Sequence, residues 1–158
     1  MQNMTETDAR AKSRKKCREI MTNSVRTASP EQTIRQVAEL MRDGDMGAVP
    51  ILDNGKLVGI VTDRDIVVRS IAEGIDATSL ISNVMSKDLS TVGPDDYVFE
   101  AIRLMGDKQV RRIPVIDETG GLAGIISMAD VALETEDELE IAEALEEISS
   151  GSSFWGKR

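Results

Sequence analysis

The chain has 158 residues, a net charge of −9 and no histidine, which excludes imidazole acid–base catalysis, His-containing triads and His-ligated zinc. Apolar residues make up 41% of the sequence and aromatic residues 3%, which predicts one compact domain with an aliphatic core. The sequence shows neither an apolar run of membrane-spanning length nor a signal-peptide h-region. Because a single cysteine, Cys17, also fits a reducing compartment, we expect a cytoplasmic protein that does not enter a membrane.

Charge is concentrated at the two ends of the chain. Residues 10–18 carry six basic groups and no acidic one, whereas residues 134–147 carry eight acidic groups and no basic one. The rest of the chain is acidic and repels a phosphate backbone, which argues against general nucleic-acid binding. The basic segment is either a solvated tail, a contact for nucleic acid, or a partner for the acidic segment of its own or another chain.

The first half of the chain predicts a strand, a helix, a hairpin and a second helix. Residues 1–17 are expected to form a flexible basic arm, and 24–28 a short extended segment. Ser29-Pro30-Glu31-Gln32 predicts a helix start with a capping box. One apolar stripe follows on a helix that ends near Gly44, formed by Ile34, Val37, Ala38 and Met41.

The hairpin is predicted by two apolar runs, 48–52 and 57–62, on either side of the turn Asp53-Asn54-Gly55. Asn-Gly favours this turn because both residues accept a positive φ. A helix is expected over 63–73, ended by Gly74, with a linker over 75–83.

The second half repeats this order. Pro94 stands 64 positions after Pro30, and the stripe recurs as Val98, Ala101, Ile102 and Met105. Strands are predicted at 113–116 and 122–127 and a helix from about Ala129. Residues 133–148 are expected to extend that helix with a stripe of Leu139, Ala142 and Leu145, before an unstructured tail with Phe154 and Trp155 as either disordered residues or a docking peptide. Two similar small units favour packing face to face about a pseudo-two-fold axis, with clefts between them.

Each hairpin ends in a hydroxyl residue with an aspartate three positions later, as Thr62 with Asp65 and as Ser127 with Asp130. One interpretation is a helix cap with an acidic residue at its third position. The other is a nucleotide site, in which free N–H groups and the hydroxyl hold a phosphate and the carboxylate accepts hydrogen bonds from a ribose diol. The residues alone leave both interpretations open.

The doubled pattern resembles a tandem pair of cystathionine β-synthase (CBS) domains, often called a Bateman module. The resemblance covers about residues 20–132 and rests on motifs present in both copies: Met21-Thr22 and Met85-Ser86, the helix starts 29–33 and 93–97, the strands around Pro50 and Pro114, and the segments 59–65 and 124–130. It implies an α+β fold of two β-α-β-β-α repeats packed about a pseudo-two-fold axis. Repeat 1 is placed at 18–74, the linker at 75–83, repeat 2 at 84–134, and an acidic helical extension with a flexible tail at 135–158.

The resemblance further implies a regulatory module that binds an adenosine ligand, such as AMP, ADP, ATP, NAD(H) or S-adenosylmethionine, in clefts between the repeats. Asp65 and Asp130 would then bind ribose, and Thr62 and Ser127 would contact phosphate. The base and phosphates would be enclosed by Thr22, Val25, Met46, Ala48, Lys87 and Arg111. Any Mg²⁺ would arrive with ATP, and many members of the family pair into homodimers.

The two copies differ near the second proline. Arg111 lies three residues before Pro114, whereas Gly47 holds that place before Pro50. Since charge-assisted contacts are about twice as strong as neutral ones, we expect tight phosphate binding at the site that Arg111 reaches; the alternative is a solvated strand edge. With no catalytic constellation in the sequence, we expect a non-enzyme that regulates an unidentified protein. The alternatives are a ligand-free interaction scaffold and nucleic-acid association through residues 10–18.

Overall fold

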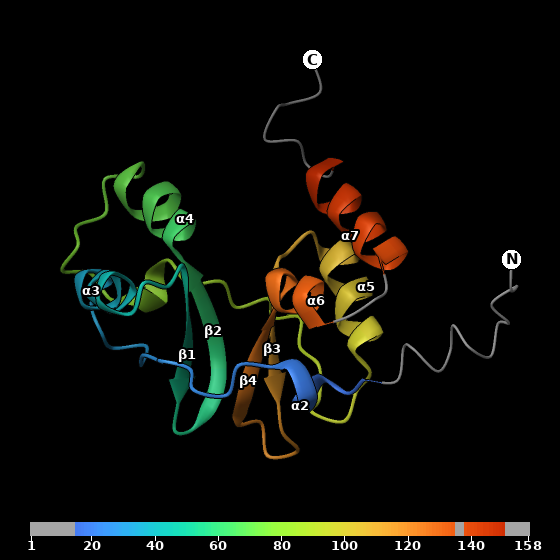
Figure 1. Cartoon of the computed structure of the whole chain (residues 1–158). Coiled ribbons are helices and arrows are strands. Elements are labelled where there is room, and N and C mark those ends of the chain that lie inside the picture. The colour runs from blue at the N-terminus through green and yellow to red at the C-terminus, as the bar shows by residue number, and fades with distance from the viewer. Residues whose placement is uncertain (1–14, 135–137, 151–158) are drawn as a thin grey trace, which may run out of the picture. The chain divides into compact units, whose positions relative to one another are not determined.

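In the computed structural model, which describes residues 15–134 and 138–150, the chain forms two compact units with one β-hairpin each (Figure 1). Unit 1 takes its described residues from Met1–Asn23, Ser90–Asp117 and Ala123–Arg158, and unit 2 consists of Ser24–Leu89 and Glu118–Leu122. The mixture of helices with two two-stranded sheets confirms the expected α+β class.

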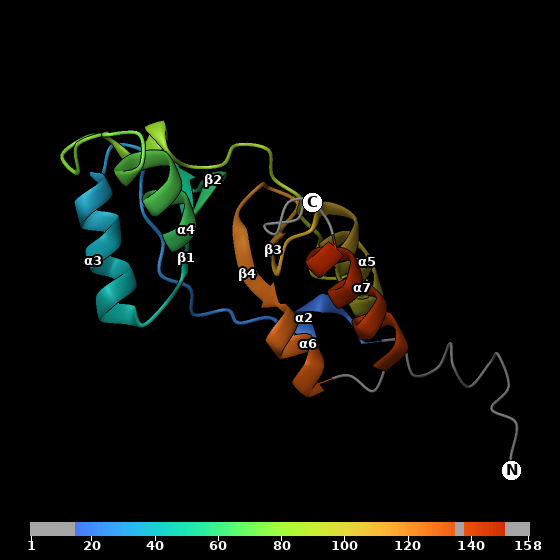
Figure 2. The same cartoon turned by 90° about the horizontal axis from the view of Figure 1, so that it is seen from above.

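The elements follow the same order in both halves of the chain. Unit 2 contains α3 (Ile34–Gly44), β1 (Ala48–Asp53), β2 (Lys56–Thr62), α4 (Asp63–Asp65), the π-helix η1 (Ile66–Ile71) and the 3₁₀-helix η2 (Ile81–Asn83). The elements that lie in or extend into unit 1 are α2 (Cys17–Ile20), α5 (Val98–Lys108), β3 (Arg112–Ile116), β4 (Leu122–Ser127), α6 (Met128–Glu134) and α7 (Glu138–Ser150). In unit 1, α7 lies along α5 in both views (Figures 1 and 2).

The first hairpin has the predicted turn. β1 and β2 are antiparallel with Ala48 opposite Thr62, and the turn residues Asn54 and Gly55 have φ values of 49° and 77°. Two successive positive φ angles are what a tight hairpin turn requires and what Asn-Gly provides. The turn therefore fixes the register that brings Thr62 to the end of β2.

Each hairpin gains a neighbouring segment on both sides, and the two arrangements are equivalent. Parallel bridges join Ala28 to Ile51 and Val92 to Val115. On the other side, Thr22 pairs with Ile125, and Ser86 pairs with Ile60. The lead-in segments Met21-Thr22 and Met85-Ser86 are thus exchanged, because each one pairs with the hairpin of the opposite sequence repeat.

Each unit has its own aliphatic core. In unit 2 the predicted stripe is buried at Ile34, Val37 and Met41, and in unit 1 at Val98, Ala101, Ile102 and Met105. The segment predicted as a linker contributes Ile81, which is fully buried in unit 2. The same segment supplies carbonyl groups to the first turn of α3, since Ser79 accepts a hydrogen bond from the Ile34 N–H at 2.9 Å.

Two helices begin later than predicted. The N-cap of α3 is Thr33, whose hydroxyl accepts from the Gln36 N–H, and the Gln36 side chain accepts from the Thr33 N–H. The predicted box at Ser29 is instead a separate turn, in which the Gln32 side chain accepts from the Ser29 N–H at 2.9 Å. In the second copy, α5 begins at Val98, after the Pro94 turn. Both prolines therefore lie in turns before the helices.

The helix predicted over 63–73 changes its winding. After the single turn of α4, η1 is a π-helix, with the Ala72 N–H bonded to the Val67 carbonyl at 2.9 Å. The wider winding leaves Val67 and Ile71 exposed and buries Ser70, whose hydroxyl donates to the Ile75 carbonyl. Periodicity alone does not distinguish such a winding from an α-helix.

The apolar stripe expected for the end of the chain is wrong. Glu138–Ser150 form the helix α7, but the side chains of Leu139, Ala142 and Leu145 are exposed. The packed face of α7 contains Ala144, which is 4% exposed, together with half-buried Ile141 and Ile148. Most of the predicted arm, the 135–137 segment and the Phe154-Trp155 tail lie outside the described residues. Among the described helices, none is long and apolar enough to traverse a bilayer.

Candidate functional site

Both hydroxyl–carboxylate pairs form reciprocal hydrogen bonds where a strand passes into a helix. In unit 2, the Thr62 N–H donates to Asp65 Oδ2 at 2.9 Å, and the Asp65 N–H donates to Thr62 Oγ1 at 3.1 Å. In unit 1, the Ser127 N–H donates to Asp130 Oδ2 and the Asp130 N–H to Ser127 Oγ, both at 3.1 Å. The capping interpretation is therefore correct as local structure, and it leaves the second carboxylate oxygen of each aspartate outside the cap.

The residue immediately before the first strand of each hairpin adds a backbone carbonyl to the two arrangements. The Gly47 carbonyl accepts from the Asp63 N–H at 3.0 Å in unit 2, and the Arg111 carbonyl accepts from the Met128 N–H at 2.8 Å in unit 1. This equivalence places Arg111 beside the start of α6, which carries Asp130. The backbone of Arg111 therefore lies at the start of α6, and its side chain is exposed.

The first helical turns differ in the N–H groups that remain free. In unit 2, the Asp63 side chain accepts the Arg64 N–H at 2.8 Å, so the backbone N–H groups of the three residues of α4 all have acceptors. In unit 1 the corresponding residue is Met128, and the N–H of the following Ala129 has no acceptor among the described residues. The Thr62–Asp65 site therefore holds the Asp63 carboxylate at the helix start, whereas the Ser127–Asp130 site leaves the Ala129 N–H for an external acceptor.

The two aspartates also have different neighbours. Asp65 Oδ1 lies 3.8 Å from Arg69 Nε, and Arg69 also donates to the Val84 carbonyl at 3.2 Å. The residue four positions after Asp130 is Glu134. The free oxygen of Asp65 therefore faces a cation of its own chain, whereas the sequence places an anion one turn after Asp130.

The remaining residues of the predicted site divide between the units. Thr22 lies in unit 1, where its backbone pairs with Ile125, two residues before Ser127, with N–O distances of 2.9 and 3.0 Å. In unit 2, Ala48 is buried opposite Thr62. Lys87 is exposed after Ser86, which pairs with the same strand.

Two residues of the predicted site are tied less directly to Thr62. Met46 immediately precedes Gly47, and its N–H bonds to the Met41 carbonyl at 3.0 Å. Val25 is half-buried three residues before Ala28, and among the described residues it forms no backbone hydrogen bond with Thr62 or Asp65. The structure thus places Ala48, Thr62 and Asp65 around one strand end, with Lys87 following a segment paired to that strand.

Two glycines allow the lead-in segments to reach the hairpins. A Cβ at Gly124 would lie 2.6 Å from the Thr22 carbonyl oxygen, and a Cβ at Gly59 would lie 2.5 Å from Met85 Sδ. Both distances are well below an ordinary van der Waals contact. A larger residue at Gly124 would have to displace the backbone that carries Thr22, and one at Gly59 would have to move the Met85 side chain, with the Ser86 carbonyl oxygen at 3.1 Å.

Sequence reasoning did not identify three contributors: the Asp63 carboxylate as an acceptor for a backbone N–H, Arg69 as the neighbour of Asp65, and the Ala129 N–H. Aligning the two repeats could have identified the Asp63 carboxylate and Arg69. Shifting by 65 positions sets Asp63 against Met128 and Arg69 against Glu134, which are changes of charge within an otherwise repeated motif.

Two halves of similar construction, each with a hydroxyl–carboxylate pair after its hairpin, define a tandem-repeat module. The model of the CBS domain matches residues 17–71 and 81–137, and the chain belongs to the CBS domain family. It is 38% identical over 132 residues to the CBS domain-containing protein YhcV of Bacillus subtilis, covering 84% of this chain and 94% of that protein. It is also 35% identical over 121 residues to the inosine-5'-monophosphate dehydrogenase of Korarchaeum cryptofilum, covering 77% of this chain but 24% of the enzyme.

Two solved structures of similar fold contain adenosine compounds. The CBS domain pair of protein MJ0100, in complex with 5-methylthioadenosine and S-adenosyl-L-methionine, has a TM-score of 0.69 and 25% identity, over 75% of this chain and 94% of that chain. The structure of CBSX2 in complex with AMP has a TM-score of 0.67 and 25% identity, over 75% of this chain and 93% of that chain.

Proposed function

We propose that this chain is a non-catalytic regulatory module that binds an adenosine nucleotide and transmits the binding to a partner protein. The hydroxyl–carboxylate pairs are the proposed ligand contacts, with Asp65 and Asp130 for ribose and Thr62 and Ser127 for phosphate. Support comes from the adenosine compounds bound by two relatives of similar fold. A match that spans 24% of a dehydrogenase is consistent with a module that accompanies an activity without performing it.

The observation that carries the proposal is the convergence of Arg111, Ser127 and Asp130 in unit 1. The Arg111 carbonyl is bonded to the first residue of α6, and its exposed side chain forms no ion pair with another described residue. A phosphate at this site would find a guanidinium, a hydroxyl and the free Ala129 N–H. An ionised donor–acceptor pair contributes roughly 1.5–3 kcal/mol, which favours a phosphorylated ligand here.

The Thr62–Asp65 site is proposed to prefer an adenosine ligand with less negative charge. The Asp63 carboxylate already accepts the Arg64 N–H, so a phosphate would compete with a fixed anion. Gly47, at the position equivalent to Arg111, provides no cation. We therefore expect this site to bind a nucleoside or a sulfonium compound better than a nucleoside phosphate, and Mg²⁺ to bind only together with a polyphosphate.

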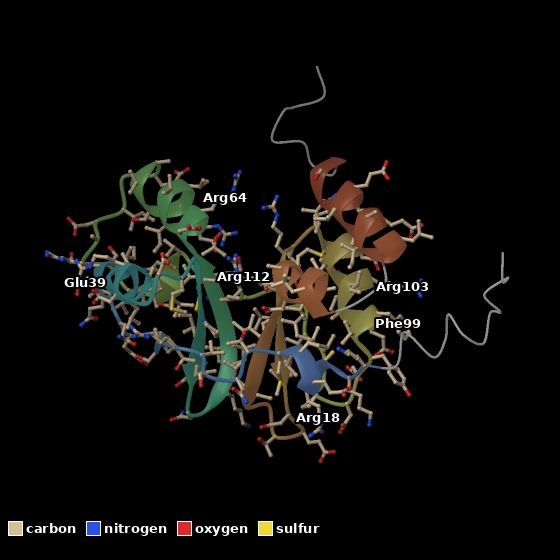
Figure 3. All side chains as sticks on the ribbon, viewed as in Figure 1. Arg18, Glu39, Arg64, Phe99, Arg103 and Arg112 are labelled. Carbon is tan, nitrogen blue, oxygen red and sulfur yellow. The ribbon has the colours of Figure 1, made fainter. Side chains whose placement is uncertain are left out.

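Titration calorimetry with AMP and with adenosine tests this assignment. Arg111→Ala should weaken AMP binding at the tighter site by about tenfold or more, the equivalent of one charge-assisted hydrogen bond, and should leave adenosine binding unchanged. Arg112→Ala is the matched control, because this exposed arginine directly follows Arg111 as the first residue of β3 (Figure 3). Equal losses in both variants would show a general charge effect and would refute the role of Arg111.

A ligand-free scaffold is the second candidate function, and the reciprocal caps favour it, because capping alone accounts for both hydroxyls and both aspartates. A thermal-shift panel of adenosine, AMP, ATP, NAD and S-adenosylmethionine separates the two functions. A ligand at one hundred times its Kd stabilises the folded state by about 2.7 kcal/mol. If no compound raises the melting temperature, the scaffold is the better description.

We also propose that two copies of the chain associate through η1. Val67, Val68 and Ile71 are exposed in a six-residue segment without an acidic residue, and contiguous apolar surface of this kind typically marks an interface. Val68→Glu should shift the protein to a monomer in sedimentation at micromolar concentration. Leu139→Glu is the control at an exposed apolar residue of a different helix, and dissociation by that variant alone would place the interface on α7.

A further inference from the structure

A groove of about 280 Å³ lies between α5 and α7 of unit 1, outside the sites described above. Its apolar lining is supplied by Ile102, Gly106 and Ala144. A Cβ at Gly106 would lie 3.3 Å from the Ala144 Cα and 2.9 Å from Glu147 Oε2. The glycine therefore lets the two helices approach closely and brings the Glu147 carboxylate over the first helix.

The charged lining of the groove is mainly acidic. Asp107, Glu143 and Glu147 contribute three negative charges against one positive charge from Arg103. The three carboxylates form no hydrogen bond or ion pair with another described residue. On α7, Glu143 and Glu147 continue a row that starts at Leu139, since positions four apart share a helix face.

The exposed face that adjoins the groove is partly apolar. Leu139 is 73% exposed, and Phe99 and Arg103 project from the same side of α5 (Figure 3). One face of α7 thus presents an exposed leucine together with carboxylates. Such a surface fits a segment that alternates small and basic residues better than it fits an anion or a wholly apolar helix.

The basic segment of this chain has that composition and starts next to the same helix. Arg10, Lys12 and Arg14 alternate with Ala11 and Ser13, so an extended backbone would place the three basic side chains on one face. Residues 1–14 lie outside the described part, but their point of attachment is fixed. The Lys15 carbonyl accepts from the Val98 N–H, at the first residue of α5, at 2.8 Å.

The distances allow the segment to reach the groove within one molecule. From Val98 to Asp107 a helix rises about 13.5 Å, at 1.5 Å per residue. Five extended residues, 10–14, span about 16 Å at 3.3 Å per residue. The segment therefore matches the length of α5 between its attachment point and the acidic lining.

We propose that residues 10–14 dock in cis onto the α5–α7 surface, with their basic side chains against Asp107, Glu143 and Glu147. The docked segment covers the open side of the groove and Leu139. Because this contact is electrostatic and partly exposed, it weakens as salt rises, the Debye length falling to about 3 Å at 1 M. The assignment gives the basic segment and the acidic helix one joint role, independent of the proposed nucleotide site.

A spin label on Ser13→Cys in the full chain tests the contact by paramagnetic relaxation of amide signals. The parent chain, in which Cys17 is buried, is carried through the same labelling as a control for specificity. In low salt, the signals of Asp107, Ala144 and Glu147 should be broadened several-fold relative to the reduced sample, and the broadening should disappear in 1 M salt. Unbroadened signals at low salt overturn the proposal.

Two glutamates on α7 provide matched variants. Glu147→Gln removes a carboxylate that lines the groove, whereas Glu146→Gln removes an exposed neighbour that does not line it. The first variant should lower the broadening by about twofold to fivefold, the range for an exposed ion pair, and the second should leave it unchanged. Equal effects overturn the proposal, because they would show attraction by net charge and not by this surface.

Mixing distinguishes a contact within one chain from a contact between copies. Spin-labelled chain without ¹⁵N is mixed with unlabelled ¹⁵N chain, so that only intermolecular contacts broaden the observed signals. Sharp signals support docking in cis. Broadening of Ala144 and Glu147 in the mixture assigns the surface to the arm of a second copy and overturns the intramolecular form.

Discussion

Replacing Gly124 by alanine should destabilise the fold more than the same replacement at Gly59. A methyl group at Gly124 would lie 2.6 Å from the Thr22 carbonyl oxygen, and that oxygen accepts the Ile125 N–H at 3.0 Å. At Gly59 the closest atom is the sulfur of the Met85 side chain, 2.5 Å away. A flexible thioether can move without breaking a backbone bond, whereas the Thr22 carbonyl cannot.

The magnitude follows from the contacts that have to change. Overpacking of this kind costs about 1–3 kcal/mol, and weakening the two hydrogen bonds between Thr22 and Ile125 adds about 0.5–1.5 kcal/mol each. The lower backbone entropy of alanine offsets roughly 0.5–1 kcal/mol. We expect the free energy of unfolding to fall by about 2–4 kcal/mol for Gly124→Ala and by about 1–2 kcal/mol for Gly59→Ala.

Urea unfolding followed by circular dichroism measures both variants, with m-values compared to verify cooperative transitions. Gly93→Ala is the control, because its nearest neighbour is an Asp96 side-chain oxygen at 3.5 Å and its φ is not positive. We expect this control to lie within about 0.5 kcal/mol of the parent chain. The reasoning would be refuted if Gly124→Ala were as stable as the control, or if Gly59→Ala were the more damaging change.

Three further predictions concern caps and titratable groups. Thr33→Ala should cost about 1 kcal/mol by urea unfolding, whereas Ser29→Ala should cost less than about 0.5 kcal/mol, because the α3 cap uses the hydroxyl of Thr33 alone. Burial, with the charges of Asp96 and Glu100, raises the pKa of Cys17 from 9.0 to about 12, so the thiol of the folded protein should react with a disulfide reagent at pH 8 about 1000-fold more slowly than the thiol in urea. The free energy of unfolding should also fall as pH rises above 9, because the unfolded thiol releases its proton first. Equal thiol reactivity in the folded protein and in urea would contradict this prediction. The hydrogen bond from Arg18 lowers the pKa of Asp95, so the contribution of Asp95 to the free energy of unfolding is present above its unfolded pKa and is lost as pH falls through its folded pKa. Asp95→Asn should remove that contribution from the acid dependence of stability. An unchanged dependence of stability on pH would argue against it.

Much of the fold was predictable because the repeat could be checked against itself. The turn at Asn54-Gly55 has local chemistry that determines its geometry, and the buried stripes of α3 and α5 follow from helical periodicity at equivalent positions. Signals that are short in range, or that occur twice, are little affected by tertiary context.

The errors arose where tertiary contacts selected between similar local signals. Ser29 and Thr33 both precede a glutamine by three residues, and the cap fell to Thr33 because carbonyl groups of the later segment around Ser79 bind the first turn of α3. The apolar residues of α7 fit more than one helical stripe. The face with Ala144 is the packed one, because Gly106 of α5 has no side chain and lets Ala144 come close. Neither choice is visible without the packing partner.

The exchange of the lead-in segments was also outside the reach of sequence reasoning. The motif order assigns Thr22 to the first repeat, yet its backbone pairs with β4 of the second repeat in unit 1. Both hairpins offer the same backbone donors and acceptors to a pairing segment, and the strand segments 59–62 and 124–127 have nearly identical sequences. A repeated sequence therefore specifies the geometry of pairing while leaving the choice of partner to the connections of the chain.

The same duplication explains why a difference between the two candidate sites escapes a comparison of net charge. At the positions compared here, each repeat has one acidic and one basic residue besides the aspartate, so these two pairs have equal net charge. The basic residue is placed differently: in unit 1 it immediately precedes β3 and its carbonyl bonds to the start of α6, whereas in unit 2 it lies one turn after the aspartate. The residues concerned are Arg111 and Glu134 in unit 1, and Asp63 and Arg69 in unit 2. Since charge-assisted hydrogen bonds require short distances, we propose that Arg111 favours a phosphate at the Ser127–Asp130 site, whereas Arg69 lies 3.8 Å from a carboxylate oxygen of Asp65.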